Sequence, residues 1–110
     1  MKLQHIVLFG FISSAGREAI EEVIRQFAAL RLLVPGVQCF EWGENCSAEG
    51  LDHGHTHAFV LTFSGVETRD HYLTHPDHVA FSDWVKPLVA SVTVVDYWAE
   101  SKAPPLLHGR

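Results

Sequence analysis

The chain has few cysteines, no surplus of positive charge and no long apolar run. Its two cysteines, Cys39 and Cys46, are too few for a disulfide framework, so we expect free thiols and a cytoplasmic protein. Eight Lys and Arg, scattered along the chain, stand against 13 Asp and Glu, which predicts no nucleic-acid partner. No apolar run approaches the roughly 20 residues that span a bilayer, and none resembles a signal peptide, so we also expect no membrane partner.

Histidine, in contrast, is abundant. Six of the eight histidines lie between residues 53 and 78, and the densest stretch runs Tyr-Leu-Thr-His-Pro-Asp-His from Tyr72 to His78. Pro76 has a φ angle near helical values and disfavours helical backbone at the residue before it. The sequence therefore predicts that one helix ends just before His75 and that another begins with Pro76 in its first turn. His75 is expected to be a structural, capping residue.

Hydrophobic periodicity predicts the order β-α-β-β-α-β, which is the ferredoxin-like arrangement of the α+β class. We expect the first and third strands to be parallel neighbours in the middle of the sheet, with both helices on one face. The other face stays apolar, so a second copy should cover it and form a homodimer, a dimeric α/β barrel. One domain is expected over residues 1–99, followed by a flexible tail over 100–110. The expected strands cover 3–11, 37–44, 55–63 and 91–98, and the expected helices 16–33, 66–73 and 76–89.

Strand parity then predicts a site. His5 shares one strand face with Val7 and Phe9, and His57 shares one with Phe59. If the two strands are parallel neighbours, His5 and His57 lie together at one end of the sheet. Tyr72 and His78 would approach them from the helices, at the polar end of an apolar pocket. The expected lining residues of the deeper part are Val7, Phe9, Val23, Phe27, Phe59 and Leu61.

Such a cluster suits proton transfer next to a carbonyl group. Histidine has an ordinary pKa of about 6.5 and can act as a general base near neutral pH. A tyrosine hydroxyl can donate a hydrogen bond to a carbonyl oxygen that becomes an enolate. No cofactor is expected. The opposing interpretation is that Tyr72 and His78 are a buried pair that only fixes the helix junction. Zinc binding by His53, His55 and His57 is not expected, because Gly54 leaves His53 in a loop.

Five segments carry a resemblance to a known family: HIVLFGF, PGVQCFEWGENCSAEGL, HTHAFVLTF, YLTHPDHVAF and VTVVDYW. On these segments the sequence resembles the stress-responsive α/β-barrel (Dabb) family over about residues 2–98. That resemblance implies a dimeric α/β barrel and, in a branch containing a plant polyketide cyclase, aldol closure without a cofactor. In that branch Tyr72 and His78 match the catalytic pair, and His5 and His57 match supporting pocket residues. The expected function is therefore a cyclase- or lyase-type enzyme on a small carbonyl or polyketide-like compound. The alternatives are a non-catalytic stress-responsive or ligand-binding protein and, from the architecture alone, a cofactor-free monooxygenase.

Overall fold

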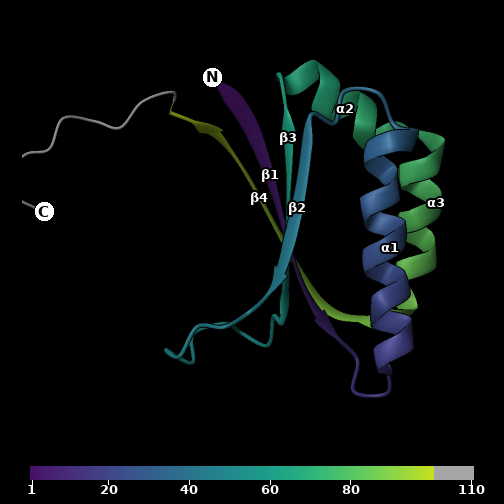
Figure 1. Cartoon of the computed structure of the whole chain (residues 1–110), viewed down its shortest axis with the longest axis vertical. Coiled ribbons are helices and arrows are strands. Elements are labelled where there is room, and N and C mark those ends of the chain that lie inside the picture. Colours follow the sequence, from purple (N-terminus) through teal and green to yellow (C-terminus); the bar gives the residue numbers. More distant parts are fainter. Residues whose placement is uncertain (101–110) are drawn as a thin grey trace, which may run out of the picture.

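A single four-stranded sheet carries helices on one face in the computed structural model, which describes residues 1–100 (Figure 1). Apart from Glu100, the tail expected over residues 100–110 lies outside the described part of the chain. The expected β-α-β-β-α-β order is confirmed, with the second helical segment divided into two helices and a short turn. The elements are β1 (Lys2–Phe11), α1 (Arg17–Leu33), β2 (Cys39–Glu44), β3 (His57–Phe63), α2 (Val66–Thr74), α3 (Pro76–Val85), the 3-10 turn η1 (Lys86–Leu88) and β4 (Val89–Ala99).

The strands lie in the order β2-β3-β1-β4, and every neighbouring pair is antiparallel. The predicted central position of β1 and β3 is correct, but their predicted parallel direction is wrong. Helix α1 carries the chain back to the end of the sheet where β1 begins, so β2 runs in the same direction as β1. The loop between β2 and β3 then reverses the chain, so β3 runs opposite to both. His5 therefore faces Leu61 across the sheet, and His57 faces Phe9. His5 and Phe9 are four residues apart, about 14 Å along the strand.

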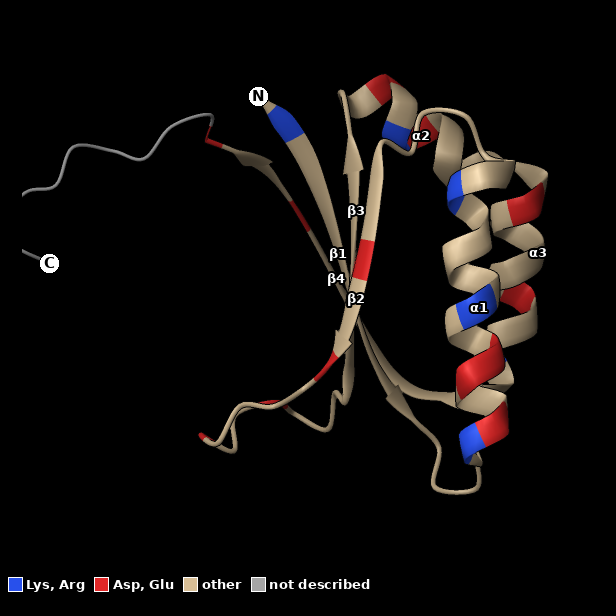
Figure 2. Ribbon diagram, in the orientation of Figure 1, with Lys and Arg blue, Asp and Glu red and all other residues tan. Residues whose placement is uncertain are grey.

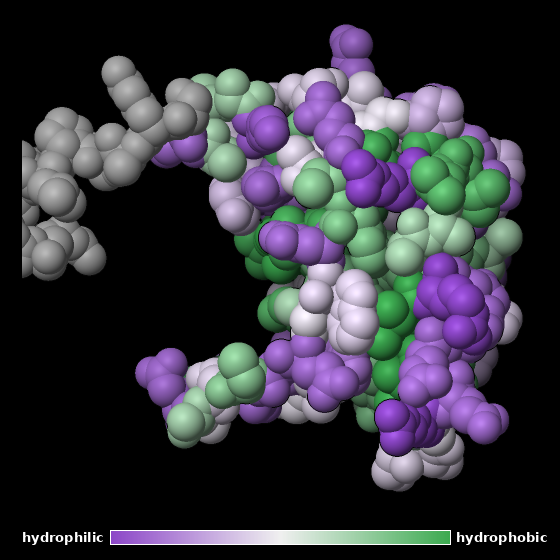
Figure 3. Space-filling model, viewed as in Figure 1, coloured by the Kyte–Doolittle hydropathy of each residue, from purple (hydrophilic) through white to green (hydrophobic). Residues whose placement is uncertain are grey.

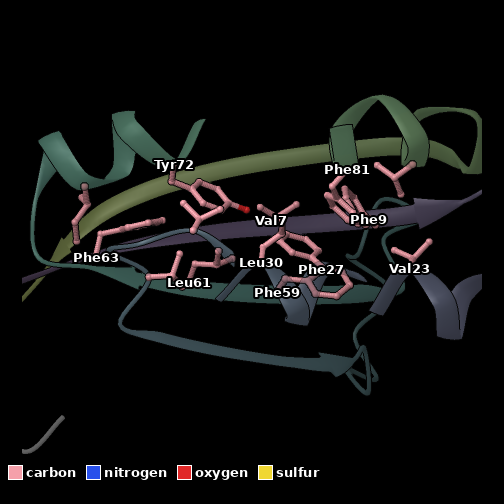
Figure 4. Packing of buried hydrophobic residues seen from close by; sticks show 14 residues of the cluster. Val7, Phe9, Val23, Phe27, Leu30, Phe59, Leu61, Phe63, Tyr72 and Phe81 are labelled. Atoms are coloured by element: carbon pink, nitrogen blue, oxygen red, sulfur yellow. The ribbon is translucent and has the colours of Figure 1, made fainter. Parts of the chain in front are cut away.

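The core lies between the helices and the sheet and is rich in aromatic rings (Figure 4). Helix α1 buries Val23, Phe27 and Leu30, whose spacing of four and three residues places them on one helix face. The ring of Phe27 stacks on Phe59 with centroids 4.5 Å apart, and it contacts Phe81 of α3 at 4.8 Å. These contacts hold α1 and α3 side by side over the sheet.

The helix junction forms as the sequence predicts. Helix α2 ends at Thr74, and His75 has the extended backbone (φ −64°, ψ 138°) that proline imposes on the residue before it. Nδ1 of His75 accepts a hydrogen bond from the backbone N–H of Asp77 at 3.1 Å, which caps α3. Pro76 is the first residue of α3, where its missing N–H costs no helical hydrogen bond. The junction therefore sets the angle at which α3 follows α2.

The face of the sheet away from the helices carries apolar side chains that nothing in the described chain covers. Val95 and Tyr97 on β4 are 52% and 48% exposed. Most charged residues lie on the helices and loops (Figure 2), and apolar groups line the hollow beside this open face (Figure 3). Of the helices within residues 1–100, none is long and apolar enough to cross a bilayer.

Candidate functional site

A cavity of about 500 Å³ opens between the helices and the outer strand β4. It exists because α1 and α3 cover β1 and β3 but leave the helix-facing side of β4 open, where Val92 and Val94 remain 56% and 53% exposed. Most of its wall is apolar, and Lys86 and Ser82 lie among its polar lining residues. The apolar wall includes Val7, Phe9, Phe27, Phe81, Val85 and Val94.

Polar side chains from four elements meet in this cavity. His5 comes from β1, Tyr72 from α2, His78 from α3 and Asp96 from β4. The ring centroids of Tyr72 and His78 are 4.5 Å apart, and those of His5 and Tyr72 are 6.0 Å apart. The structure therefore brings together three of the four polar residues that the sequence predicted for the site.

Tyr72 has a buried hydroxyl group without a partner. The residue is fully buried, and among the described residues its hydroxyl is the one buried side-chain polar atom that makes no hydrogen bond. Figure 4 shows the hydroxyl pointing inward from α2 toward Val7. Burial raises the pKa of the phenol, so Tyr72 keeps its proton and is a hydrogen-bond donor at neutral pH. A buried donor that lacks an acceptor is costly, unless a ligand supplies one.

His78 is held in one orientation by the helix junction. Its Nδ1 lies 3.0 Å from the carbonyl oxygen of Leu73, and because a carbonyl only accepts, Nδ1 carries the proton. Nε2 then keeps a lone pair. Burial lowers the pKa of His78 by more than the hydrogen bond with the Leu73 carbonyl raises it. His78 is therefore a neutral imidazole at neutral pH and is able to accept a proton.

His5 contacts a charged pair, Asp96 and Arg69, that the sequence analysis missed. Its Nδ1 lies 2.6 Å from Oδ1 of Asp96, and Oδ2 of the same carboxylate lies 2.6 Å from Nη1 of Arg69. The hydrogen bond with Asp96 is the main cause of a raised pKa at Arg69. Asp96 could have been found from the sequence, because it lies directly opposite His5 on the neighbouring strand and faces the same side.

His57 does not belong to this cluster. The prediction that it lies beside His5 is wrong, because the antiparallel direction of β3 places it at the other end of the sheet. There its ring stacks on Trp42, meets Phe11 edge to face, and has Nδ1 within 2.8 Å of the Thr56 hydroxyl. Burial lowers the pKa of His57 as well. It lines a second cavity of about 520 Å³ beneath the loop that joins β2 to β3.

The apolar lining was predicted only in part. Val7, Phe9 and Phe27 line the cavity beside β4 as expected, whereas Phe59 is fully buried beneath Phe27 and does not reach this cavity. Val23 and Leu61 are core residues in the same way. The helix α3 and strand β4 supply lining residues that the sequence analysis missed: Phe81, Val85, Val92 and Val94. For Val92 and Val94 the signal was the position of β4 beside β1, which places alternate β4 side chains on the cavity side.

Residues 1–100 contain no group of three or more His, Cys, Asp or Glu side chains arranged to hold a metal ion. The cavity instead joins a protonated phenol and a neutral imidazole at the polar side of an apolar space. Fold and site together define a small ferredoxin-like protein with a ligand-sized pocket that has polar groups at one side of an apolar wall. The sequence matches the family described as "Stress responsive A/B Barrel Domain" over residues 3–99, and the chain belongs to that family.

Two curated relatives cover most of the chain. The "Stress-response A/B barrel domain-containing protein HS1" of Arabidopsis thaliana is 36% identical over 95 residues, which is 86% of this chain and 87% of that protein. The olivetolic acid cyclase of Cannabis sativa is 27% identical over 97 residues, which is 88% of this chain and 96% of the cyclase.

Solved structures share the same fold. The crystal structure of the Arabidopsis thaliana protein At3g17210 has a TM-score of 0.87 and 34% identity, covering 93% of this chain and 99% of that one. A hydroxynitrile lyase from Passiflora edulis has a TM-score of 0.83 and 23% identity, covering 94% and 97%. A dimeric ferredoxin-like protein of unknown function from Thermobifida fusca has a TM-score of 0.75 and 24% identity, covering 88% and 90%.

Proposed function

We propose that this protein is a cofactor-independent enzyme of the cyclase or lyase type that acts on a small apolar carbonyl compound. The observation that carries the proposal is the hydroxyl of Tyr72, which is buried, protonated and without a partner in a cavity large enough for a ligand. A carbonyl oxygen placed in the cavity would satisfy this donor. The apolar wall would hold the rest of the molecule.

The reaction follows from the two side chains at the polar end. Nε2 of His78 takes a proton from the carbon next to the carbonyl group, and the electron pair of the broken C–H bond moves onto the carbonyl oxygen. The Tyr72 hydroxyl donates a hydrogen bond to the resulting enolate oxygen. The enolate carbon then attacks a second carbonyl, which closes a ring, or expels a leaving group. His78 returns its proton to the new alkoxide or to the leaving group, so no external acid or base is consumed.

The relatives support the same class of reaction. One is named a cyclase and one structural neighbour is named a lyase. The order of residues from Tyr72 to His78 and the pocket are features of this chain itself, and they do not depend on those names.

Tyr72→Phe tests the proposal because it separates a ligand-binding hydroxyl from a structural one. Because the Tyr72 hydroxyl makes no hydrogen bond, its removal is expected to leave the free energy of unfolding unchanged or to raise it by about 1 kcal/mol. Hydrogen–deuterium exchange at the carbon next to a carbonyl, followed by NMR on a set of small ketones and β-keto esters, is expected to slow by about 100-fold or more. Urea denaturation supplies the stability measurement.

The opposite result would remove the proposal. A Tyr72→Phe variant that loses about 1–3 kcal/mol of stability behaves as if a buried hydrogen bond had been broken, which fits a structural corner. Ser14→Ala, which removes an exposed hydroxyl in the loop before α1, is the control and is expected to change neither measurement.

A non-catalytic ligand-binding or stress-responsive role is the second candidate. It is favoured by the 36% identity to a protein named only for its stress-response domain. In that case small carbonyl compounds would shift the NMR signals of Tyr72 and His78. The protein would not raise the rate of proton exchange in any of these compounds.

The apolar sheet face supports a homodimer, and dimeric ferredoxin-like structural neighbours support it too. Two copies facing each other would cover Val95 and Tyr97, and we expect the dimer to act in the cytoplasm. Sedimentation at micromolar concentration is expected to give twice the mass of one chain. Val95→Asp is expected to produce a monomer, whereas Leu32→Asp, on the fully exposed side of α1, should remain dimeric. A folded wild-type monomer at this concentration would contradict the proposal.

A further inference from the structure

We propose that Arg69 is a positioning residue of the site, acting through Asp96 to hold His5 with its proton on Nδ1 and its Nε2 free toward the cavity. The expected effect of Arg69 on the reaction rate rests on the proposed function. Its effect on the orientation of His5 does not. It adds a second residue of α2, beside Tyr72, to a site whose other members come from β1, α3 and β4.

The contacts of Arg69 differ from those of the other arginines in ion pairs. The side chains of Arg69 and Asp96 are only 20% and 21% exposed, and the distance from Nη1 to Oδ2 is 2.6 Å. Arg17 and Glu21 are 92% and 55% exposed, and Arg25 and Glu22 are 67% and 37% exposed, so both those pairs lie in solvent. Arg69 and Asp96 are 27 residues apart in the sequence and lie on different elements, whereas both residues of each of the other two pairs lie on α1. An ion pair that is shielded and links separate elements fixes geometry more firmly than a solvated one.

Arg69 and His5 use different oxygens of one carboxylate. Oδ2 of Asp96 binds the guanidinium and Oδ1 lies against Nδ1 of His5, so the carboxylate cannot rotate without breaking one contact. An ionised carboxylate only accepts, which places a proton on Nδ1 of His5. Within residues 1–100 no hydrogen bond involves Nε2 of His5, and the ring lines the cavity. His5 therefore presents a second acceptor nitrogen beside that of His78.

The charges around His5 explain why the arginine matters. His5 faces Asp96 from β4, Tyr72 from α2 and His78 from α3, and the guanidinium of Arg69 stands behind Asp96. Arg69 supplies a positive charge that balances Asp96, and it also pairs with the exposed carboxylate of Asp70 at 2.8 Å. Without Arg69, the contact with His5 alone would hold the Asp96 carboxylate, which could then rotate. The His5 ring would no longer be fixed with its proton on Nδ1.

Arg69→Met, Arg69→Lys and Arg25→Met test the inference on the full-length protein. In ¹⁵N NMR of the histidine side chains at pH 7, wild type, Arg69→Lys and Arg25→Met are expected to show His5 with a protonated Nδ1 and an unprotonated Nε2. Arg69→Met is expected to show a second tautomer of His5, with the proton on Nε2. With the ketone probe that exchanges fastest, Arg69→Met should lower kcat by about 10- to 100-fold, the range known for partners that orient metal-bound histidines, with KM unchanged.

The NMR spectrum tests the positioning role of Arg69, and the activity tests the proposed reaction, so either can be contradicted without the other. A wild-type-like His5 spectrum in Arg69→Met overturns the positioning role of Arg69, whatever the activity. A changed spectrum in a protein that exchanges no probe, even as wild type, keeps the positioning role and removes the proposed reaction. If Arg69→Met does not fold, Arg69→Gln, which keeps an amide donor without the charge, decides the same question by the same spectrum.

Discussion

Replacing His78 by asparagine is expected to lower the rate of proton exchange next to a carbonyl by about 100- to 10,000-fold, the usual contribution of a general base. The fold should survive, because the asparagine amide can donate to the Leu73 carbonyl from nearly the position that Nδ1 occupies. The variant therefore keeps the hydrogen bond that orients the junction and removes only the nitrogen with the lone pair. The measurement is the same NMR exchange assay, together with urea denaturation to check the fold.

The pH dependence of the exchange rate is a second test of the role of His78. Burial lowers the pKa of His78 from its ordinary value of 6.5, so the free base is the main form at pH 7. The wild-type rate should be level above pH 6.5 and should fall with acid through a midpoint below that value. The residual rate of His78→Asn should lack this midpoint. His71→Asn, at an exposed histidine on α2, should keep both the wild-type rate and the midpoint. Equal losses in the two variants would contradict the assignment.

Local chemistry made the helix junction predictable from the sequence. Pro76 restricts both its own backbone and that of His75, so the end of α2 and the start of α3 follow from two adjacent residues. The positions of Tyr72 and His78 on either side of this junction follow as well. Their unpaired hydroxyl and fixed tautomer do not, because these depend on distances between helices that the sequence pattern does not contain.

The placement of the histidines shows what strand parity can and cannot predict. Alternation along a strand assigns each side chain to a face, and it placed His5 correctly on the face under the helices. Which ends of two strands lie together depends on their direction, and the wrong direction for β3 moved His57 into the wrong cluster. The same parity, applied to the neighbouring strand β4, would have found Asp96.

Arg69 was beyond the sequence analysis for a different reason. Nothing in its helical position distinguishes it from a solvated arginine, and its partner Asp96 is 27 residues away. The contact depends on how α2 lies over the end of β4, which packing of the whole domain decides. A functional residue that acts through a long-range ion pair is thus visible only in the folded chain.

Phe59→Ala is expected to lower the free energy of unfolding by about 3–5 kcal/mol, the range for a large-to-small substitution in a core. The sequence placed Phe59 in the pocket, but the structure places it in the core, fully buried under Phe27 and in contact with Phe9. Removing its ring leaves a cavity that these neighbours, held by the sheet and α1, cannot close. Denaturation should be compared at one protein concentration, because a dimer would link stability to concentration.

Val94→Ala is the matched substitution at a residue that does line the cavity. Val94 is 53% exposed, so the loss of its methyl groups should cost less than about 1 kcal/mol of stability. Ligand titrations should instead detect it, as a lower affinity for the most apolar ketone probes with no change for the smallest. If Phe59→Ala lost less than about 1 kcal/mol, the ring would not be part of a rigid core. The apolar wall would then extend to β3, as the sequence alone suggested, and ligands would reach deeper than the cavity between α3 and β4.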